Sequence, residues 1–366
     1  MNGNVLELHD VAVTYDGRTV LEVPQLAVRR GEVLTLLGEN GSGKTTLLRL
    51  LGLLIRPARG SVLFGGEEVD FGNARRLLEL RRRMAGVMQE PLLCRMSVRR
   101  NVALGLRFRR LPKPETKERV DSWLKRLSIS HLRDRPASNL SGGEARRISL
   151  ARAMVLDPEV LFLDEPFSAL DAPTRQRQLQ EFQAVLSESG VTAVFATHDR
   201  GEALSLGDRL AVLMGGCVAQ IGSAETVFFR PGQVEVARFV GIETLIPGRV
   251  TGMANGLVQV NCGEIQLEAE GDSEAGEEVY VAVRPEEIDF FDGRGPPLSD
   301  ACNLIVGRVT KMSPQETHYR VEIDCGVPVV AAVSRASFRQ MPLEAGLRVQ
   351  ATFPARAAHL IRRGHD

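Results

Sequence analysis

Two short motifs constrain this 366-residue chain more than any other feature of its sequence. Residues 38–45 read Gly-Glu-Asn-Gly-Ser-Gly-Lys-Thr, which is the phosphate-binding-loop pattern GxxxxGK[ST]. Residues 140–144 read Leu-Ser-Gly-Gly-Glu, a glycine-rich turn that opens a helical pattern and is a second candidate for anion binding. A chain with both motifs has the parts to grip a nucleotide from two sides, which favours a nucleotide that joins two copies of the chain.

The first motif stands in the context that a phosphate-binding loop requires. It follows the apolar run 33–37, typical of a buried strand, and it leads into the helical pattern 45–54. Glycines let backbone N–H groups turn inward around a phosphate, and the helix N-terminus adds the positive end of its dipole. Lys44 is predicted to reach the β- and γ-phosphates and Thr45 to hold Mg²⁺, so ATP and Mg²⁺ are the expected cofactors. The predicted ATP-binding residues of this loop are Gly38, Glu39, Asn40, Gly41, Ser42, Gly43, Lys44, Thr45 and Thr46.

Two carboxylates and a histidine follow apolar runs further along the chain. The run 160–163 ends in Asp164 and Glu165, and His198 follows the run 191–197. Asp164 is expected to bind Mg²⁺, and Glu165 to polarise the attacking water as general base. His198 is expected to contact the γ-phosphate or to orient the water. Taken alone, a glycine-rich turn, solvated carboxylates and a structural histidine are each common, but their combination favours the catalytic interpretation.

Composition narrows the classes of protein. Lys and Arg together number 46, as do Asp and Glu, so the formal net charge is zero and no nucleic-acid partner is expected. No apolar run approaches the roughly 20 residues that span a bilayer, and residues 1–10 lack the pattern of a signal peptide. The five cysteines are scattered and form no CxxC pair, which favours reduced thiols in a cytosol over a metal site.

The pattern of the sequence changes near residue 240. Up to that point, short apolar runs alternate with helical patterns, which predicts an α/β domain over residues 1–240 with a parallel sheet between helices. Beyond it, period-two alternation with frequent Gly and Pro predicts a small all-β region. Residues 245–253 and 304–312 are identical at seven of nine positions, so two tandem β modules are expected. The expected modules are 241–296 and 297–366, with a linker at 293–300.

With these residues assembled, the stretch from 5 to about 240 resembles the ATP-binding subunit of ABC transporters, a P-loop NTPase fold with a helical subdomain at about residues 90–150. In this resemblance Gln89 corresponds to the Q-loop residue, a catalytic position and Mg²⁺ ligand, and His198 to the switch histidine. Tyr15 falls where the family stacks an aromatic ring on adenine, the alternative being a surface tyrosine. The D-loop positions are Ser168 and Asp171, and the signature is Leu140, Ser141, Gly142, Gly143 and Glu144.

The resemblance implies a head-to-tail homodimer in which each ATP lies between the phosphate loop of one copy and the signature of the other. Ser141 and Gly143 then contact the γ-phosphate in trans, and its hydrolysis opens the dimer. Gln89 reports the nucleotide state to residues 90–110, which meet a membrane partner. The implied partners are two integral membrane permease subunits and, indirectly, a solute-binding protein, with the chain peripheral at the cytoplasmic face of the membrane. Many importer ATPases carry Gln-Gln-Arg or Gln-Arg after Leu-Ser-Gly-Gly, where this chain has Glu144-Ala-Arg-Arg147.

The β modules resemble the OB-like TOBE/Mop domains that follow the ATPases of bacterial importers, most closely those of the molybdate and tungstate type. Mop modules grip an oxyanion near a Ser-Ala-Arg-Asn-like segment, where this chain has Asp300-Ala-Cys302-Asn303. A carboxylate in the serine position and a thiol in the arginine position predict poor binding of a dianion. The alternative role of the modules is dimerisation or rigidity.

Three classes of function remain open. The first is an importer ATPase, for tungstate or molybdate or else for sulfate, iron, sugars or polyamines. The second is a soluble ABC ATPase that acts on DNA or ribosomes, although only 96 residues separate Lys44 from Ser141 and they hold no sustained heptads. The third is an oxyanion-sensing or storage protein with an attached ATPase. The arginine-dense stretches 75–83 and 95–110 are either solvated helix faces or contacts with the partner or with lipid headgroups.

Overall fold

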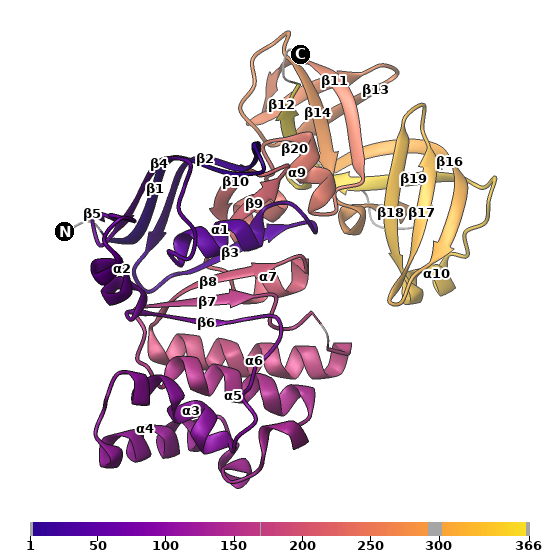
Figure 1. The fold of residues 1–366 in the computed structure, drawn as a ribbon. Helices are drawn as coiled ribbons and strands as arrows, with labels where there is room; N and C mark the ends of the chain where they lie inside the picture. Colours follow the sequence, from indigo (N-terminus) through magenta and orange to yellow (C-terminus); the bar gives the residue numbers. More distant parts are fainter. Residues whose placement is uncertain (1–2, 169, 292–301, 364–366) are drawn as a thin grey trace. The chain divides into compact units, whose positions relative to one another are not determined.

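The computed structural model describes residues 3–168, 170–291 and 302–363 of the chain. It divides into two compact units, Met1–Ala224 and Glu225–Asp366 (Figure 1). The boundary between the units therefore lies at residue 224, whereas the sequence pattern changes near residue 240. The difference arises because α8 (Ala224–Phe229) and α9 (Val234–Phe239) pack with the β region. Nη2 of Arg284 in that region donates to the carbonyls of Phe228 and Val240 at 2.8 and 3.3 Å. The expected linker 293–300, including Asp300, and the next residue Ala301 lie outside the described residues.

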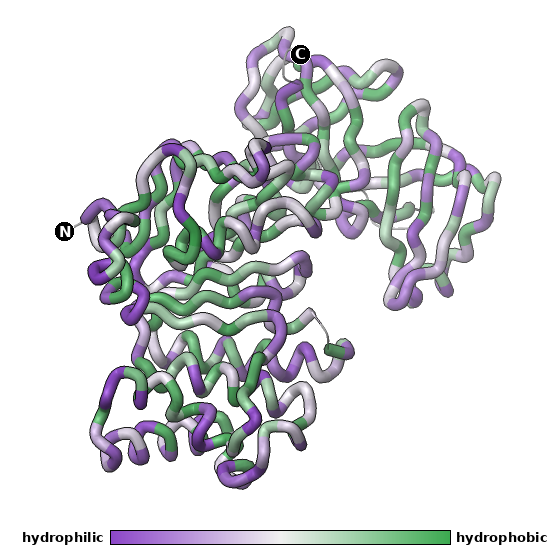
Figure 2. Tube along the Cα trace, viewed as in Figure 1, coloured by the Kyte–Doolittle hydropathy of each residue, from purple (hydrophilic) through white to green (hydrophobic). Residues whose placement is uncertain are grey.

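A ten-stranded mixed sheet runs through the first unit in the order β5-β4-β1-β2-β10-β9-β3-β8-β7-β6. The part from β9 to β6 is parallel throughout. Strands β3, β7 and β8 are buried at every position, as continuous apolar runs predict for strands covered on both faces, and Figure 2 shows hydrophobic residues concentrated along them. The strands are β1 Asn4–Tyr15, β2 Arg18–Arg29, β3 Val33–Gly38, β4 Arg59–Phe64, β5 Glu67–Glu68, β6 Met84–Val87, β7 Val160–Asp164, β8 Thr192–Thr197, β9 Arg209–Met214 and β10 Cys217–Ser223.

The helical subdomain consists of α3, α4 and α5 and is held by one apolar cluster. Val102 and Leu106 of α3 meet Leu124 of α4 and Leu150 of α5 in this cluster. Within the described residues, no helix is both long and apolar enough to cross a bilayer. The helices of the first unit are α1 Lys44–Leu51, α2 Ala74–Arg81, α3 Val98–Phe108, α4 Lys113–Arg126, α5 Gly142–Met154, α6 Ala172–Ser189 and α7 Arg200–Leu206, with 3-10 turns at Ser130–Leu132 and Ala137–Asn139.

The second unit is built on two five-stranded antiparallel sheets, as the all-β pattern predicts. Their strand orders are β13-β12-β11-β14-β20 and β15-β19-β16-β17-β18. The strands are β11 Thr244–Ala254, β12 Leu257–Cys262, β13 Ile265–Ala269, β14 Glu278–Val283, β15 Asp289–Phe291, β16 Cys302–Pro314, β17 His318–Asp324, β18 Pro328–Ser334, β19 Arg348–Pro354 and β20 His359–Arg362, with the helix α10 Arg335–Gln340 and 3-10 turns at Pro285–Glu287 and Ala355–Ala357.

The two sheets repeat each other in register. Arg249 pairs with Asn261 in the first sheet as Arg308 pairs with Asp324 in the second, and each ladder shifts register just after these pairs. In each sheet, the repeated cysteine leaves no room for a side chain at the repeated glycine. A Cβ at Gly307 would lie 2.5 Å from Sγ of Cys325, and the equivalent distance from Gly248 to Cys262 is 2.7 Å. The sequence repeat therefore produces the same glycine–cysteine packing in both sheets.

Each module gives its last strand to the other sheet. Strand β15 precedes the linker but pairs with β19 of the second sheet, and β20 at the end of the chain pairs with β14 of the first. The division into modules 241–296 and 297–366 thus differs from the structure, because residues 289–291 and 359–362 are exchanged. Two buried side chains tie the sheets together. Thr244 bonds both backbone groups of Val330, and Asn303 bonds both backbone groups of Glu268.

The cysteines give a test of this packing. Burial raises the pKa of Cys262 and of Cys325 to about 11, so roughly one thiol in a thousand is ionised at pH 8 at these positions. We expect iodoacetamide at pH 8 to label the exposed Cys94 and Cys217 and to spare Cys262 and Cys325 until the chain is denatured. Peptide mass spectrometry measures the labelling. Rapid labelling of Cys325 in the folded chain would contradict the packing of the second sheet.

Candidate nucleotide-binding site

The loop between β3 and α1 has the geometry of a phosphate cradle. Gly41 and Gly43 lie in the left-handed region at φ +82° and +102°, which a residue with a side chain rarely adopts. At Gly38 a Cβ would lie 2.5 Å from the carbonyl oxygen of Leu213 and 2.5 Å from Oγ of Ser42. Because residues 39–41 are exposed, the loop is open to a ligand. The glycines of the motif are therefore required by backbone conformation and by close approach.

Lys44 is the first residue of α1, and its side chain folds back across the loop. Its Nζ donates to the carbonyl oxygens of Gly38 at 2.8 Å and Glu39 at 2.9 Å. The residue is 5% exposed, so the ammonium is almost fully removed from water. Oε1 of Glu165 lies 3.5 Å away and is the nearest opposite charge. A triphosphate in the loop would offer this buried cation stronger partners than the two neutral carbonyls.

Two oxygen ligands stand beside the loop. Oγ1 of Thr45 donates to Oδ1 of Asp164 at 3.3 Å, although the two residues lie 119 positions apart in sequence. Burial raises the pKa of Asp164, and the hydrogen bond from Thr45 opposes that shift. A hydroxyl and a carboxylate match the preference of Mg²⁺, which usually takes one or two protein oxygens and completes its shell with phosphates and water. The described residues hold no cluster of three or more His, Cys, Asp or Glu arranged for a metal ion. The donor set thus fits a metal bound together with a phosphate ligand.

Glu165 lies at the centre of the cluster. Its backbone N–H donates to the carbonyl of Ala196 at 3.0 Å, while its φ of +42° places a non-glycine residue in the left-handed region. Such strain costs about 1–3 kcal/mol and gathers at functional sites. Its Oε2 lies 3.1 Å from Nδ1 of His198, and its side chain is 15% exposed. Glu165 is thus held between Lys44 and His198, as a base that acts on a water at the phosphate requires.

The Q-loop and D-loop residues meet each other. Nε2 of Gln89 donates to Oγ of Ser168 at 3.2 Å, and that hydroxyl donates to the carbonyl of Glu165 at 3.1 Å. Asp171 caps α6 by accepting the N–H of Thr174 at 3.1 Å, and this hydrogen bond lowers the pKa of Asp171. Gln89 is therefore connected through Ser168 to the backbone of Glu165, and its role as a Mg²⁺ ligand stays a prediction.

An arginine of α6 also belongs to this part of the site, and no motif in the sequence points to it. Arg175 donates to the carbonyl of Leu170 at 3.1 Å and to Oδ2 of Asp199 at 3.0 Å. Asp199 in turn caps α7 through the N–H of Glu202 at 2.9 Å. The D-loop is thus fastened to the residue that follows His198.

The signature turn is capped by its own helix and lies close against α6. Ser141 caps α5 in a capping box, with its Oγ accepting from the N–H of Glu144 and its own N–H donating to the Glu144 carboxylate at 2.7 Å. That N–H is the main cause of the lowered pKa of Glu144, with a smaller contribution from Arg135. At Gly143 a Cβ would lie 2.6 Å from Nε2 of Gln178. Across the described residues, no hydrogen bond or ion pair joins residues 140–144 to residues 38–46.

Two further residues from the sequence analysis, Tyr15 and Asn303, lie outside this cluster. Tyr15 ends β1 and is 45% exposed, which suits both an adenine platform and an ordinary surface tyrosine, so its role stays a prediction. Asn303 is 5% exposed, and both ends of its amide already bond to the backbone of Glu268, at 2.7 and 2.8 Å. It would have to release this contact between the sheets to hold an oxyanion, in line with the poor dianion binding that the sequence predicts.

Comparison with known proteins identifies the families that the chain resembles. The ABC transporter family model matches residues 21–168, and the TOBE domain model matches residues 281–361. The molybdate/tungstate import ATP-binding protein of Pyrococcus horikoshii is 36% identical over 91% of this chain and 93% of its own length. A spermidine/putrescine import ATP-binding protein of Oleidesulfovibrio alaskensis is 38% identical over 78% of this chain and 76% of its own.

Solved structures extend the comparison. A subunit of an ABC transporter complex of Clostridium perfringens has a TM-score of 0.59 and 32% identity over 66% of this chain and 96% of its own. A dimeric ATP-binding cassette in a post-hydrolysis state with ADP and Pi has a TM-score of 0.55 and 28% identity over 60% of this chain and 98% of its own.

Replacing Lys44 tests the phosphate cradle. We expect Lys44→Ala to weaken ATP binding roughly tenfold to a hundredfold, because it removes a charge-assisted hydrogen bond to the phosphates. Isothermal titration calorimetry measures the affinity, and Lys125→Ala, an exposed lysine of α4, is the control. ATP affinity that is unchanged in a folded Lys44→Ala chain would remove this loop from the site.

Proposed function

The chain belongs to the ATP-binding import subunits of the ABC transporter family, and from this premise we propose that it drives uptake of an oxyanion such as molybdate or tungstate. The observation that carries the proposal is the joining of Lys44, Glu165 and His198 into one hydrogen-bonded and ion-paired cluster beside the phosphate loop. The choice of oxyanion rests on the relative from Pyrococcus horikoshii, whose similarity covers 91% of this chain. Polyamine uptake is the second candidate, since relatives that import spermidine and putrescine reach 38% identity over 78% of the chain.

Each residue of the cluster has a defined task in hydrolysis. Lys44 leaves the carbonyls of Gly38 and Glu39 for the phosphates. Thr45 and Asp164 supply the oxygens for Mg²⁺, which neutralises charge on the phosphates when it is bound. Glu165 accepts the proton of the attacking water, and His198 holds the carboxylate through Nδ1.

We further propose that two copies associate head to tail around two ATP molecules. One copy contains one phosphate loop and one signature turn, and no hydrogen bond or ion pair joins the two within the described part of a copy. The dimeric cassette among the similar solved structures supports the association of two copies. The open N–H groups of the α5 N-terminus then face the terminal phosphate of the partner's ATP.

The proposed route from the nucleotide to the membrane partner runs through the segment after Gln89. Ser149 of α5 donates to the carbonyl of Pro91 at 2.8 Å, and Arg152 donates to the carbonyl of Leu92 at 2.9 Å. Gln89, bonded to Ser168, is therefore coupled to the helix that the signature opens. A movement of the segment that follows Gln89 would move α5 with it.

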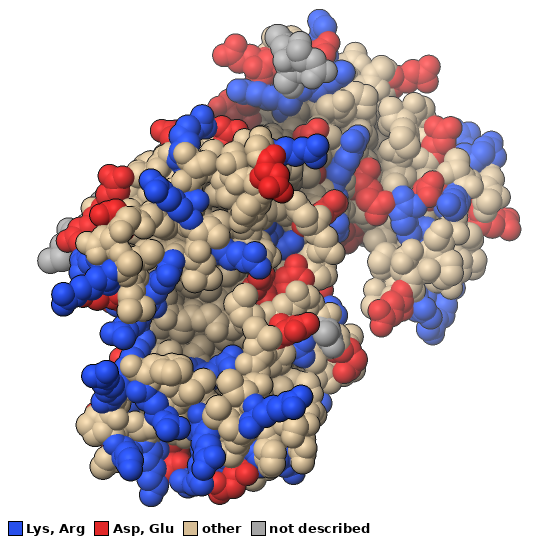
Figure 3. Space-filling view, in the orientation of Figure 1, with Lys and Arg blue, Asp and Glu red and all other residues tan. Residues whose placement is uncertain are grey.

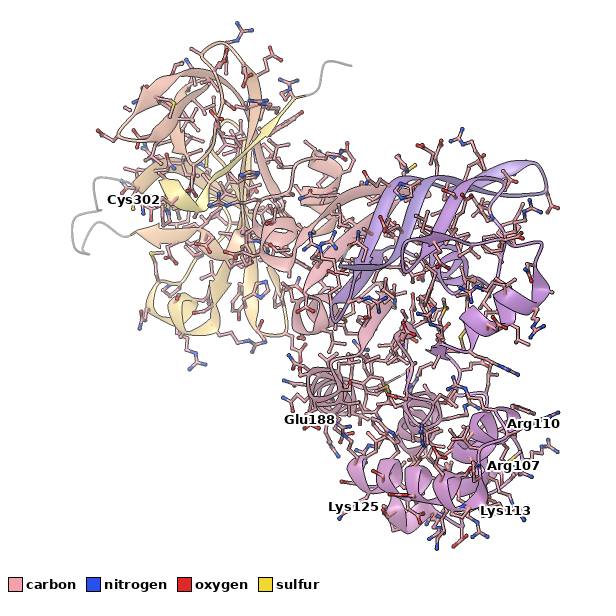
Figure 4. The ribbon with its side chains drawn as sticks, turned by 90° about the vertical axis from the view of Figure 1, so that its left-hand side faces the viewer. Arg107, Arg110, Lys113, Lys125, Glu188 and Cys302 are labelled. Carbon is pink, nitrogen blue, oxygen red and sulfur yellow. The ribbon has the colours of Figure 1, made fainter. Side chains whose placement is uncertain are left out.

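The face proposed for the permease is basic and partly apolar. Figure 3 shows Lys and Arg gathered over α3 and α4, and in Figure 4 Arg107, Arg110 and Lys113 project near the turn between these helices, away from Lys125. An adjoining hollow of about 260 Å³ is lined by side chains that include the 71%-exposed Phe108. Docking there would place the chain at the cytoplasmic face of the membrane beneath two permease subunits, with a solute-binding protein acting through them.

Transport in the source organism tests the substrate class. We expect cells whose only copy carries Lys44→Ala to lose uptake of molybdate and tungstate, measured as cellular Mo and W by mass spectrometry, while spermidine uptake continues. Loss of spermidine uptake with normal Mo and W would replace the oxyanion proposal by the polyamine one.

Glu165→Gln tests the base. We expect ATP turnover to fall about 100-fold to 10,000-fold, because the amide cannot accept the proton, while ATP binding persists and a dimer accumulates. Phosphate release and light scattering measure the two effects. Rapid turnover by this variant would remove Glu165 from the role.

Charge reversal tests the docking face. We expect Arg107→Glu with Arg110→Glu and Lys113→Glu to weaken association with membranes that hold the permease at least tenfold, through lost charge complementarity. The control reverses the exposed Lys125, Lys311 and Arg339 and changes the net charge equally. Basal ATPase activity of both proteins should match the parent, and equal membrane association would contradict the assignment.

A further inference from the structure

One arginine of the signature helix is buried and has no partner among the described residues. Arg146 is 6% exposed, and its Nε is buried and donates to no acceptor in that part of the chain. Nor does a described side chain form an ion pair with its guanidinium. The other two arginines of α5 differ, since Arg147 bonds both oxygens of Glu181 at 2.6 and 2.7 Å and Arg152 bonds the carbonyls of Pro91 and Leu92. Such an unpaired buried charge is unfavourable and therefore unusual.

The guanidinium lies against the first turn of α5. Its Nη1 is 3.8 Å from the position that a Cβ on Gly142 would occupy. This agrees with the general lean of helical side chains toward the helix N-terminus. Oε1 of Gln178 is likewise buried and unpartnered, and its Nε2 lies beneath Gly143. Two buried polar side chains with unsatisfied atoms thus gather under one glycine-rich turn.

A group from outside the single chain is the natural partner for this cation. Burial lowers the pKa of Arg146, and no nearby charge offsets that shift. The turn above it is the N-terminus of a 13-residue helix, whose free N–H groups and dipole attract an anion. In the proposed head-to-tail dimer, the anion that arrives at this turn is the terminal phosphate of the ATP held by the partner copy.

We propose that Arg146 is a phosphate-binding residue that acts in trans, placing its guanidinium on the terminal phosphate held by the partner copy. This inference rests on the proposed function, because it needs the ATP-bound dimer. The buried charge then destabilises the separate copy and is compensated only in the dimer. ATP, with its terminal phosphate, thereby gains a contact that ADP cannot make.

The test separates binding from hydrolysis by using Glu165→Gln as the parent. Dimerisation at saturating Mg-ATP is measured by analytical ultracentrifugation, and the melting temperature Tm of the nucleotide-free chain is measured in parallel. We expect Arg146→Met to weaken the dimer roughly tenfold or more, the effect of one lost charge-assisted hydrogen bond, while Tm stays level or rises. Arg146→Lys should retain most of the dimer affinity. Arg152→Met, on the same helix, is the control and should lower Tm with little effect on dimerisation.

The outcomes are distinct. Dimerisation of Arg146→Met as tight as that of the parent would overturn the proposal whatever its Tm. A fall in Tm together with weak dimerisation that Arg146→Lys does not restore would assign Arg146 to packing and overturn it as well. If Arg146→Met does not fold, Arg146→Gln decides by the same two readings. A parent that forms no dimer with ATP would overturn the proposed function itself, and the assignment of Arg146 with it.

Discussion

The buried ammonium of Lys44 is the interaction on which the site depends. A cation that is 5% exposed needs oxygen partners, and the chain supplies two loop carbonyls and, at 3.5 Å, the carboxylate of Glu165. Those carbonyls can turn toward Nζ because the loop carries glycine where the backbone is left-handed or crowded. One charge therefore shapes the loop and also holds Glu165, the proposed base, in place. A triphosphate that binds Lys44 would release both constraints at once.

Both halves of the nucleotide site contain buried polar atoms that lack a partner among the described residues. In and beside the phosphate loop, Thr45 and Glu165 have partners within the chain, but Oγ of Ser42 is buried and has none. Beneath the signature turn, Nε of Arg146 and Oε1 of Gln178 are buried in the same way. Buried polar groups in native proteins are normally paired, so these atoms are candidates for contact with a ligand or a second molecule. The proposed dimer would bring a triphosphate to both places.

The sequence predicts the parts of the fold whose local physics is strong. Strands β3, β7 and β8 are apolar throughout because helices cover both faces of the sheet, and the loop glycines are demanded by backbone conformation. The link between Arg175 and Asp199 joins residues 24 apart through the meeting of two helices, and no local pattern encodes it. The sequence could not predict the exchange of β15 and β20 for a different reason. Since the two modules share a sequence repeat, the pattern alone does not decide which sheet each of these strands joins.

The exchanged strands bear on what the tail can do. Because each sheet contains a strand from the other module, neither module can turn independently without breaking a ladder of backbone hydrogen bonds. Thr244 and Asn303 add a buried side-chain contact at equivalent places in the two repeats. Asn303 lies in the segment that corresponds to the oxyanion-binding segment of Mop modules, yet its side chain forms this contact between the sheets. Asn303 therefore helps to join the two sheets. Together with the exchanged strands, this contact links the two modules firmly, which favours a structural role of the tail over oxyanion sensing.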